Sequence, residues 1–139
     1  KNLIFFGSID DVWFDTENNN YICVILKSTS KNQTLQTTNI WEGYWKHLSY
    51  YSYLLQKNNI KTSRNGLIFY INTRQPNGGQ SKIHFEFHLF ERILDFTWIE
   101  ECFLNIHDTL NSNIIPKFTP NCKFCNYVKN INASQNEKS

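Results

Sequence analysis

The sequence contains no methionine, only five glycines and three prolines in 139 residues, and no long hydrophobic run. Its apolar runs are short and interrupted by polar residues, which excludes a membrane-spanning helix of about 20 apolar residues. No charged stretch followed by an apolar run and small residues, the pattern of a secretory signal, stands at the start. We therefore expect an intracellular protein, cytoplasmic or organellar, with no membrane partner.

The composition is that of a folded domain with a mild positive charge. Hydrophobic residues make up 40% of the chain and aromatic residues 16%, which provides a core and excludes wholesale disorder. A net charge of +2 permits binding to a polyanion without requiring it, since dedicated nucleic-acid modules are usually more basic. The length suits one compact domain, which we place at residues 1–129, followed by a polar, frayed tail at 130–139.

The first third of the chain predicts a β-hairpin. Residues 3–14 are rich in isoleucine, phenylalanine and tryptophan and predict a strand with a bend or close approach at Gly7. A polar turn at 15–20 leads into 21–27, a nearly continuous apolar run typical of a strand covered on both faces. The two strands are expected to pair in antiparallel fashion.

A helix is expected next. After a polar loop at 28–39, apolar side chains recur every three or four residues from Trp41 to Leu55, which predicts about four helical turns ending near Asn58. One of three polar residues is expected to cap its start, namely Thr37, Thr38 or Asn39.

Two more strands and a second helix complete the predicted order β-β-α-β-β-α. Residues 66–71 predict a buried strand, closed by a turn at 75–79. In 81–90, apolar residues alternate with Lys82, His84, Glu86 and His88, the pattern of a strand with one wet face. Thr97 and Glu100 have the spacing of a capping box at a helix start. The order predicts an α/β fold with a mixed sheet.

The hairpin also places chemistry-bearing side chains together. Asp10 lies in the first apolar strand and Lys27 ends the second, so pairing of the strands brings an acid and a base to one end of the sheet. A carboxylate that holds Mg²⁺ and a lysine that stabilises developing charge are what metal-dependent phosphodiester hydrolysis uses. An ordinary ion pair at a solvated strand end is the alternative interpretation.

Residues 7–13 (GSIDDVW) and 21–31 (YICVILKSTSK) resemble the core hairpin of the PD-(D/E)XK nuclease superfamily, in particular its RecB-like and CRISPR-adaptation exonuclease branch. The resemblance extends over nearly the whole chain, through 51–58, 66–70 and 115–127. It implies a restriction-endonuclease-like fold, a mixed β-sheet flanked by helices, and a Mg²⁺ or Mn²⁺ cofactor in active members. It also implies that an N-terminal helical portion of the usual domain is absent here.

The resemblance implies roles for individual residues. Asp10 matches the metal-binding aspartate, and Lys27 matches the lysine of the (D/E)-x-K signature. The acidic position of that signature is occupied by Ile25, which cannot bind a metal. In the family's Gln-x-x-x-Tyr helix motif, Tyr51 matches the tyrosine and His47 replaces the glutamine.

The leading hypothesis follows from Ile25, which leaves the expected metal site without its second carboxylate. Mg²⁺ prefers carboxylate oxygens, and two protein carboxylates are usual in this fold. Asp11 is expected to point to the opposite face from Asp10, although Glu42 remains a candidate substitute and His47 a candidate phosphate donor or ligand of a softer metal. We therefore expect a nuclease-fold protein with an incomplete metal site, retained for binding nucleic acid, DNA rather than RNA, or as a subunit of a larger protein assembly.

Two alternatives remain open. One is an active Mg²⁺- or Mn²⁺-dependent DNA nuclease that uses Asp10, a substitute ligand and Lys27. The other is a purely structural protein–protein module. Several aromatic side chains on the helix are expected to be core residues, and those left exposed near lysines would stack on bases or bind a protein partner.

The four cysteines lie at positions 23, 102, 122 and 125, and without a secretory signal they are expected to be reduced thiols or ligands. Cys122 and Cys125 form half of a zinc or iron–sulfur site. His84 and His88, on one face of their strand, are candidates to complete it. Two free thiols or a packed loop are the favoured interpretation, with Cys102 a small core residue.

Overall fold

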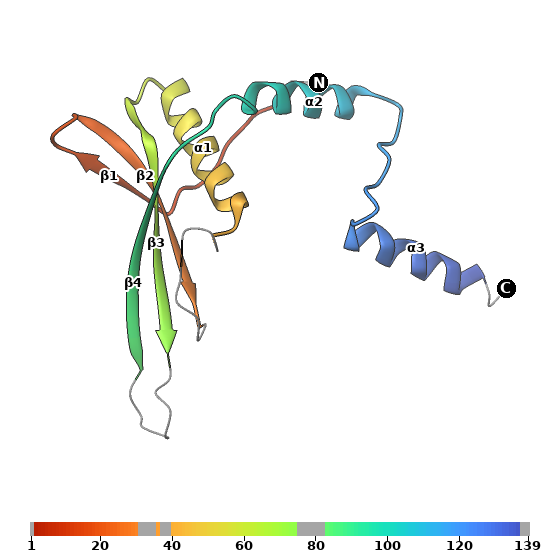
Figure 1. Ribbon diagram of the computed structural model, residues 1–139. Coiled ribbons are helices and arrows are strands. Elements are labelled where there is room, and N and C mark those ends of the chain that lie inside the picture. Colours follow the sequence, from red (N-terminus) through yellow and green to blue (C-terminus); the bar gives the residue numbers. More distant parts are fainter. Residues whose placement is uncertain (1, 31–35, 37–39, 75–82, 137–139) are drawn as a thin grey trace. The chain divides into compact units, whose positions relative to one another are not determined.

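The computed structural model describes residues 2–30, 36, 40–74 and 83–136. The elements of this part are β1 (Asp11–Asp15), β2 (Asn20–Thr29), α1 (Glu42–Lys57), β3 (Thr62–Arg74), β4 (His84–Ile93), α2 (Ile99–Asn111) and α3 (Lys123–Asn136) (Figure 1). Residues 4–102 form one compact unit, and residues 103–139 with 1–3 form a second. Among the described helices, none has the length and apolar character needed to cross a membrane.

The sheet is mixed, with the strand order β1-β2-β3-β4. β1 and β2 form the expected antiparallel hairpin, in which Asp11 lies opposite Val24. The chain then crosses through α1 to β3, which pairs with β2 in parallel, and β4 returns antiparallel to β3. The α/β class and the mixed sheet predicted from the element order are confirmed.

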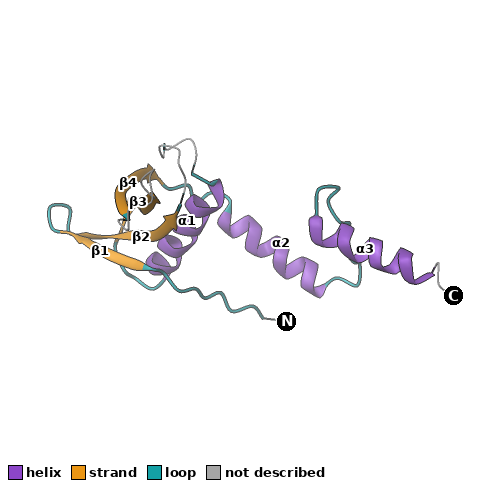
Figure 2. Ribbon diagram, turned by 90° about the horizontal axis from the view of Figure 1, so that it is seen from below, coloured by secondary structure: helices purple, strands orange, loops and turns teal. Residues whose placement is uncertain are grey.

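α1 covers one face of the sheet, where it packs against β2 and β3 (Figure 2). Its apolar side chains recur at helical spacing, so that Trp45 and Leu48 point into the core. There they meet Ile25 of β2 and Ile68 of β3, all at most 4% exposed. Leu94, just after β4, closes the same cluster. The core of this unit therefore lies between α1 and the middle of the sheet.

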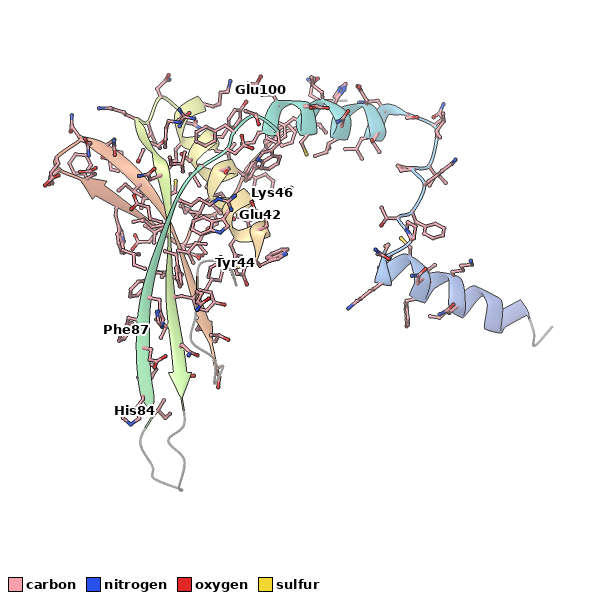
Figure 3. All side chains as sticks on the ribbon, viewed as in Figure 1. Glu42, Tyr44, Lys46, His84, Phe87 and Glu100 are labelled. Carbon is pink, nitrogen blue, oxygen red and sulfur yellow. The ribbon has the colours of Figure 1, made fainter. Side chains whose placement is uncertain are left out.

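The alternation predicted for β4 is present, but its solvent-facing side is the opposite of the expected one. Phe85, Phe87 and Leu89 are 57%, 62% and 53% exposed, whereas Glu86 and His88 are half-buried. Phe87 lies on the side of β4 away from α1 (Figure 3) and stacks on Phe69, with ring centroids 5.9 Å apart. The cause is the register between β3 and β4, which a local pattern does not encode.

Several element boundaries differ from the sequence-based expectation. The first strand spans only Asp11–Asp15, because its ladder with β2 begins at Asp11. The following strands are longer than predicted, since β2 runs to Thr29 and β3 spans Thr62–Arg74. The predicted frayed tail from residue 130 is wrong up to Asn136, where α3 ends. The predicted turn at 75–79 lies outside the described residues.

Both predicted helix caps are wrong. The N-cap of α1 is Trp41, which makes no side-chain capping hydrogen bond, and residues 37–39 lie outside the described part. The Thr97 hydroxyl donates to Asp95 Oδ1 at 2.7 Å instead of capping α2. Glu100, the other half of the predicted capping box, bonds to side chains of α1. Asp95, two residues earlier, binds Thr97, and side chains of α1 bind Glu100, so neither residue caps α2 as predicted.

Glu100 connects α1 to the first turn of α2. Its Oε1 accepts hydrogen bonds from Lys57 Nζ at 3.0 Å and from the Tyr53 hydroxyl at 2.9 Å. The bond from Lys57, followed by that from Tyr53, holds the pKa of the Glu100 carboxyl below its ordinary value of 4.5. Because the folded state lowers this pKa, the link stabilises the fold above the ordinary value, and the stabilisation is lost as the pH falls through the folded value.

We expect an NMR titration of the Glu100 side chain to show a midpoint below the ordinary glutamate value. Lys57→Met should move that midpoint upward, because it removes the ammonium that favours the carboxylate. Lys46→Met is the matched control, since Lys46 lies on the same helix over the Trp98 ring. A midpoint that is insensitive to Lys57→Met would contradict the link.

Candidate functional site

The hairpin and the segment before it bring Asp10 and Lys27 together. Lys27 Nζ lies 4.0 Å from Asp10 Oδ2, and the two side chains are 30% and 43% exposed. The same Oδ2 accepts a hydrogen bond from the Leu26 backbone N–H at 2.9 Å. The convergence expected from the pairing of β1 and β2 is therefore present, at a position open to solvent.

At the position where the resemblance to the PD-(D/E)XK signature leads us to expect an acid, the chain has a core side chain. Ile25, two residues before Lys27 on β2, is 2% exposed and belongs to the core cluster. The two other candidate acids, Asp11 and Glu42, form hydrogen bonds elsewhere. The Asp11 carboxylate accepts the backbone N–H of Val12 and the indole N–H of Trp13. Glu42 Oε2 accepts a hydrogen bond from Arg92 Nη1 at 2.6 Å.

These residues do not fit a Mg²⁺ or Mn²⁺ site. In the described part of the chain, no three histidine, cysteine, aspartate or glutamate residues are grouped so that they could hold a metal ion. Asp10 alone supplies one carboxylate, and its Oδ2 is already close to the Lys27 ammonium. A hard divalent cation needs several oxygen ligands. The candidate substitute Glu42 is paired with Arg92 in this structure.

Lys27 is surrounded by polar and aromatic groups on the α1 side of the sheet. Its Nζ lies 4.9 Å from the centroid of the Tyr44 ring, a cation–π contact. Along the sheet, Lys27 is opposite Tyr70 of β3, which in turn is opposite His88 of β4. Burial, with a smaller contribution from Tyr44, raises the pKa of Tyr70.

The sequence does not indicate that His88 and Tyr70 lie opposite each other on neighbouring strands. His88 Nε2 has no hydrogen-bond partner among the described residues and lies 3.8 Å from Glu86 Oε2. The signal was the polar alternation in residues 84–88, which predicted a solvent-facing strand surface. The strand register instead places this polar set in line with Lys27.

A row of aromatic rings follows α1 away from Lys27. We call it the aromatic row, and neighbouring ring centroids in it are 5.2 to 6.4 Å apart. Trp41 is 63% exposed, and His47 is also exposed. The Trp41 ring lies over Gly43, where the absence of a Cβ leaves room for it. The members of the aromatic row are Trp41, Tyr44, His47, Tyr50 and Tyr51.

The two predicted helix-motif residues, His47 and Tyr51, lie in this row. Their ring centroids are 6.2 Å apart, and Tyr51 also packs against the core. Within the described residues, no hydrogen bond or ion pair joins either of them to Asp10 or Lys27. A Cβ at Gly7 would lie 2.7 Å from Tyr51 Cε1, so the close approach predicted at Gly7 is confirmed.

The cysteine pair lies at the start of α3. Cys122 and Cys125 have their Sγ atoms 2.6 Å apart, and both are free thiols. Neither belongs to a metal-binding group within the described ranges, which include His84 and His88. Cys23 is buried, and this burial raises its pKa to about 11, while Cys102 is half-buried on α2. A zinc or iron–sulfur centre is therefore not assembled by the described residues.

Comparison with protein-family models, with curated proteins and with solved structures finds no match for this chain. The likeness to PD-(D/E)XK nucleases therefore stays a prediction from the sequence. The chain combines the Asp10–Lys27 pair, the buried Ile25 and the aromatic row on the α1 side of the sheet.

Proposed function

We propose that this chain is a nuclease-fold protein that binds single-stranded DNA through Lys27 and the aromatic row without cleaving it. The observation that carries the proposal is the position of Lys27 beside Tyr44, at one end of a row of aromatic rings. Proteins that bind single strands combine cations that contact the backbone with aromatic rings on which successive bases stack.

The exposed members of the row supply the stacking surface. Trp41 is the largest of them and is 63% exposed. The ring of His47, six residues later, lies at a centroid distance of 6.4 Å from it. In a duplex the bases are already stacked on each other, so this surface favours unpaired strands. Lys27, held on a rigid strand, supplies a cation for a phosphate.

The absence of cleavage follows from Ile25. An aliphatic side chain enclosed by Leu48 and Ile68 provides no metal ligand where the superfamily signature has an acid. Without a bound cation, the Asp10 carboxylate repels phosphate and partly neutralises Lys27. The pair therefore retains a binding role and lacks the means to activate water.

A second candidate function, a structural module of a protein assembly, is favoured by the apolar side of β4. Phe85, Phe87 and Leu89 leave more than half of their surface exposed in the described structure. Contiguous apolar surface of this kind often marks a protein interaction site. This alternative requires no affinity for nucleic acid, so the same experiment separates the two candidates.

The test is fluorescence anisotropy with a labelled single-stranded DNA oligonucleotide, followed by a denaturing gel. We expect binding whose affinity falls as salt rises and is similar in EDTA, Mg²⁺ and Mn²⁺, with the oligonucleotide intact. The matched duplex should bind more weakly. Metal-dependent shortening of the strand would support the active-nuclease alternative, and no binding at any salt would support the structural module.

A further inference from the structure

The start of α3, with the residues just before it, holds two cysteines in a fixed turn. The Cys122 backbone N–H donates to the Thr119 carbonyl at 3.0 Å, and the Asn126 N–H donates to the Cys122 carbonyl at 3.0 Å. The Asn126 side-chain amide also donates to the Pro120 carbonyl at 3.2 Å. These bonds fix the backbone on both sides of Cys122, so its side chain has a defined direction.

That direction brings the two thiols together. Cys122 Sγ lies 2.6 Å from Cys125 Sγ and accepts the Cys125 backbone N–H at 3.2 Å. Both side chains are half-buried and thus reachable from solvent. By contrast, Cys23 is 1% exposed, and the structure places no other cysteine in such contact with Cys102 within the described residues. The pair is the place where two sulfur atoms are positioned to react with each other.

We propose that Cys122 and Cys125 form a reversible intramolecular disulfide by exchange with a low-molecular-weight disulfide of the glutathione class. Cys122 is the attacking sulfur, because its Sγ accepts the Cys125 backbone N–H in the first turn of α3, a position that favours a thiolate. The proposal does not rest on the proposed binding of DNA.

The exchange balances in two steps. The Cys122 thiolate attacks one sulfur of oxidised glutathione, which breaks its S–S bond, forms a mixed disulfide and releases one glutathione thiolate. Cys125 then loses its proton to solvent and attacks the Cys122 sulfur, which releases the second glutathione thiolate. Two protein thiols are oxidised to one disulfide, and one glutathione disulfide is reduced to two thiols.

Lys123, between the two cysteines, makes the product easy to identify. Trypsin cleaves after Lys117, Lys123 and Lys129, so the cysteines fall in separate peptides, 118–123 and 124–129. The reduced full-length chain is equilibrated with oxidised and reduced glutathione, alkylated and digested without reductant. We expect the two peptides to appear linked, two mass units lighter than their sum, while the Cys102 peptide is alkylated or carries glutathione.

Three variants make the test decisive. Cys122→Ser should prevent the linkage, Cys125→Ser should leave glutathione on Cys122, and Cys102→Ser should change nothing. The same equilibration, at a series of ratios of oxidised to reduced glutathione, is repeated in urea. Because α3 is unfolded there and no longer holds the two thiols together, a higher ratio should be needed to form the linkage. The proposal is overturned if both peptides are alkylated at glutathione ratios at which Cys102 already carries glutathione. It is also overturned if the linkage forms equally well in urea.

Discussion

Ile25→Asp is expected to lower the free energy of unfolding by about 3 kcal/mol or more, a large part of the roughly 5–15 kcal/mol by which a typical domain is stable. Ile25 is 2% exposed and packs in the cluster that includes Leu48 and Ile68. The substitution removes the apolar contacts and buries a carboxylate without a described partner in that cluster. Urea denaturation followed by circular dichroism measures the change.

Leu26→Asp is the matched control, one residue along β2. Leu26 is 43% exposed, so the same new charge remains hydrated there, and a loss of under about 1 kcal/mol is expected. If the Ile25→Asp and Leu26→Asp variants had the same free energy of unfolding, the side chain at position 25 would be able to leave the core and turn toward Lys27. The site would then accept a second carboxylate, and Ile25 would not be what leaves the metal site incomplete.

The second large effect concerns DNA affinity. Trp41→Ala should weaken binding to single-stranded DNA by about five- to a hundred-fold, because stacking of one base on an aromatic ring contributes about 1–3 kcal/mol. The dependence of affinity on salt should stay unchanged, since no charge is removed. Lys27→Gln should weaken binding by about tenfold and reduce the slope of log affinity against log salt by about one.

Lys46→Gln and Trp13→Ala are the matched controls for this pair. Lys46 lies over Trp98, and Trp13 is a β1 residue that packs near Phe69. Lys46→Gln removes an ammonium group, as Lys27→Gln does, and Trp13→Ala removes an indole ring, as Trp41→Ala does. Both controls lie outside the Lys27 site and the aromatic row. Anisotropy titrations at several salt concentrations give both affinity and slope. Equal losses from the controls would show that binding depends on overall charge and aromatic content.

The sequence predicts the elements whose signals are local. The spacing of apolar residues from Trp41 to Leu55 reflects packing on one helix face, and α1 spans Glu42–Lys57. The apolar run at 21–27 becomes the central part of β2, with Val24 and Ile25 buried. Because the hairpin turn is short and polar, the approach of Asp10 to Lys27 also follows from sequence.

Features set by long-range pairing were not predictable in the same way. The alternation in β4 fixes the period of its side chains, but the register with β3 decides that His88 lies in line with Tyr70 and Lys27. Thr97 and Glu100 have capping-box spacing, yet Glu100 accepts a hydrogen bond from Lys57 of α1, a partner 43 residues away that a local pattern does not reveal. The contact between Cys122 and Cys125 depends on a helix start at Lys123, which the polar composition of the tail concealed.

The most direct test of the central claim is the affinity of Asp10→Asn for single-stranded DNA, measured in EDTA and in Mg²⁺. Asparagine keeps an oxygen for the Leu26 N–H and removes the charge 4.0 Å from Lys27. The account predicts tighter binding than wild type in both conditions, with uncut DNA, because the carboxylate repels phosphate. Weaker binding in Mg²⁺, together with loss of a wild-type cleavage product, would contradict it and show that Asp10 holds a catalytic metal.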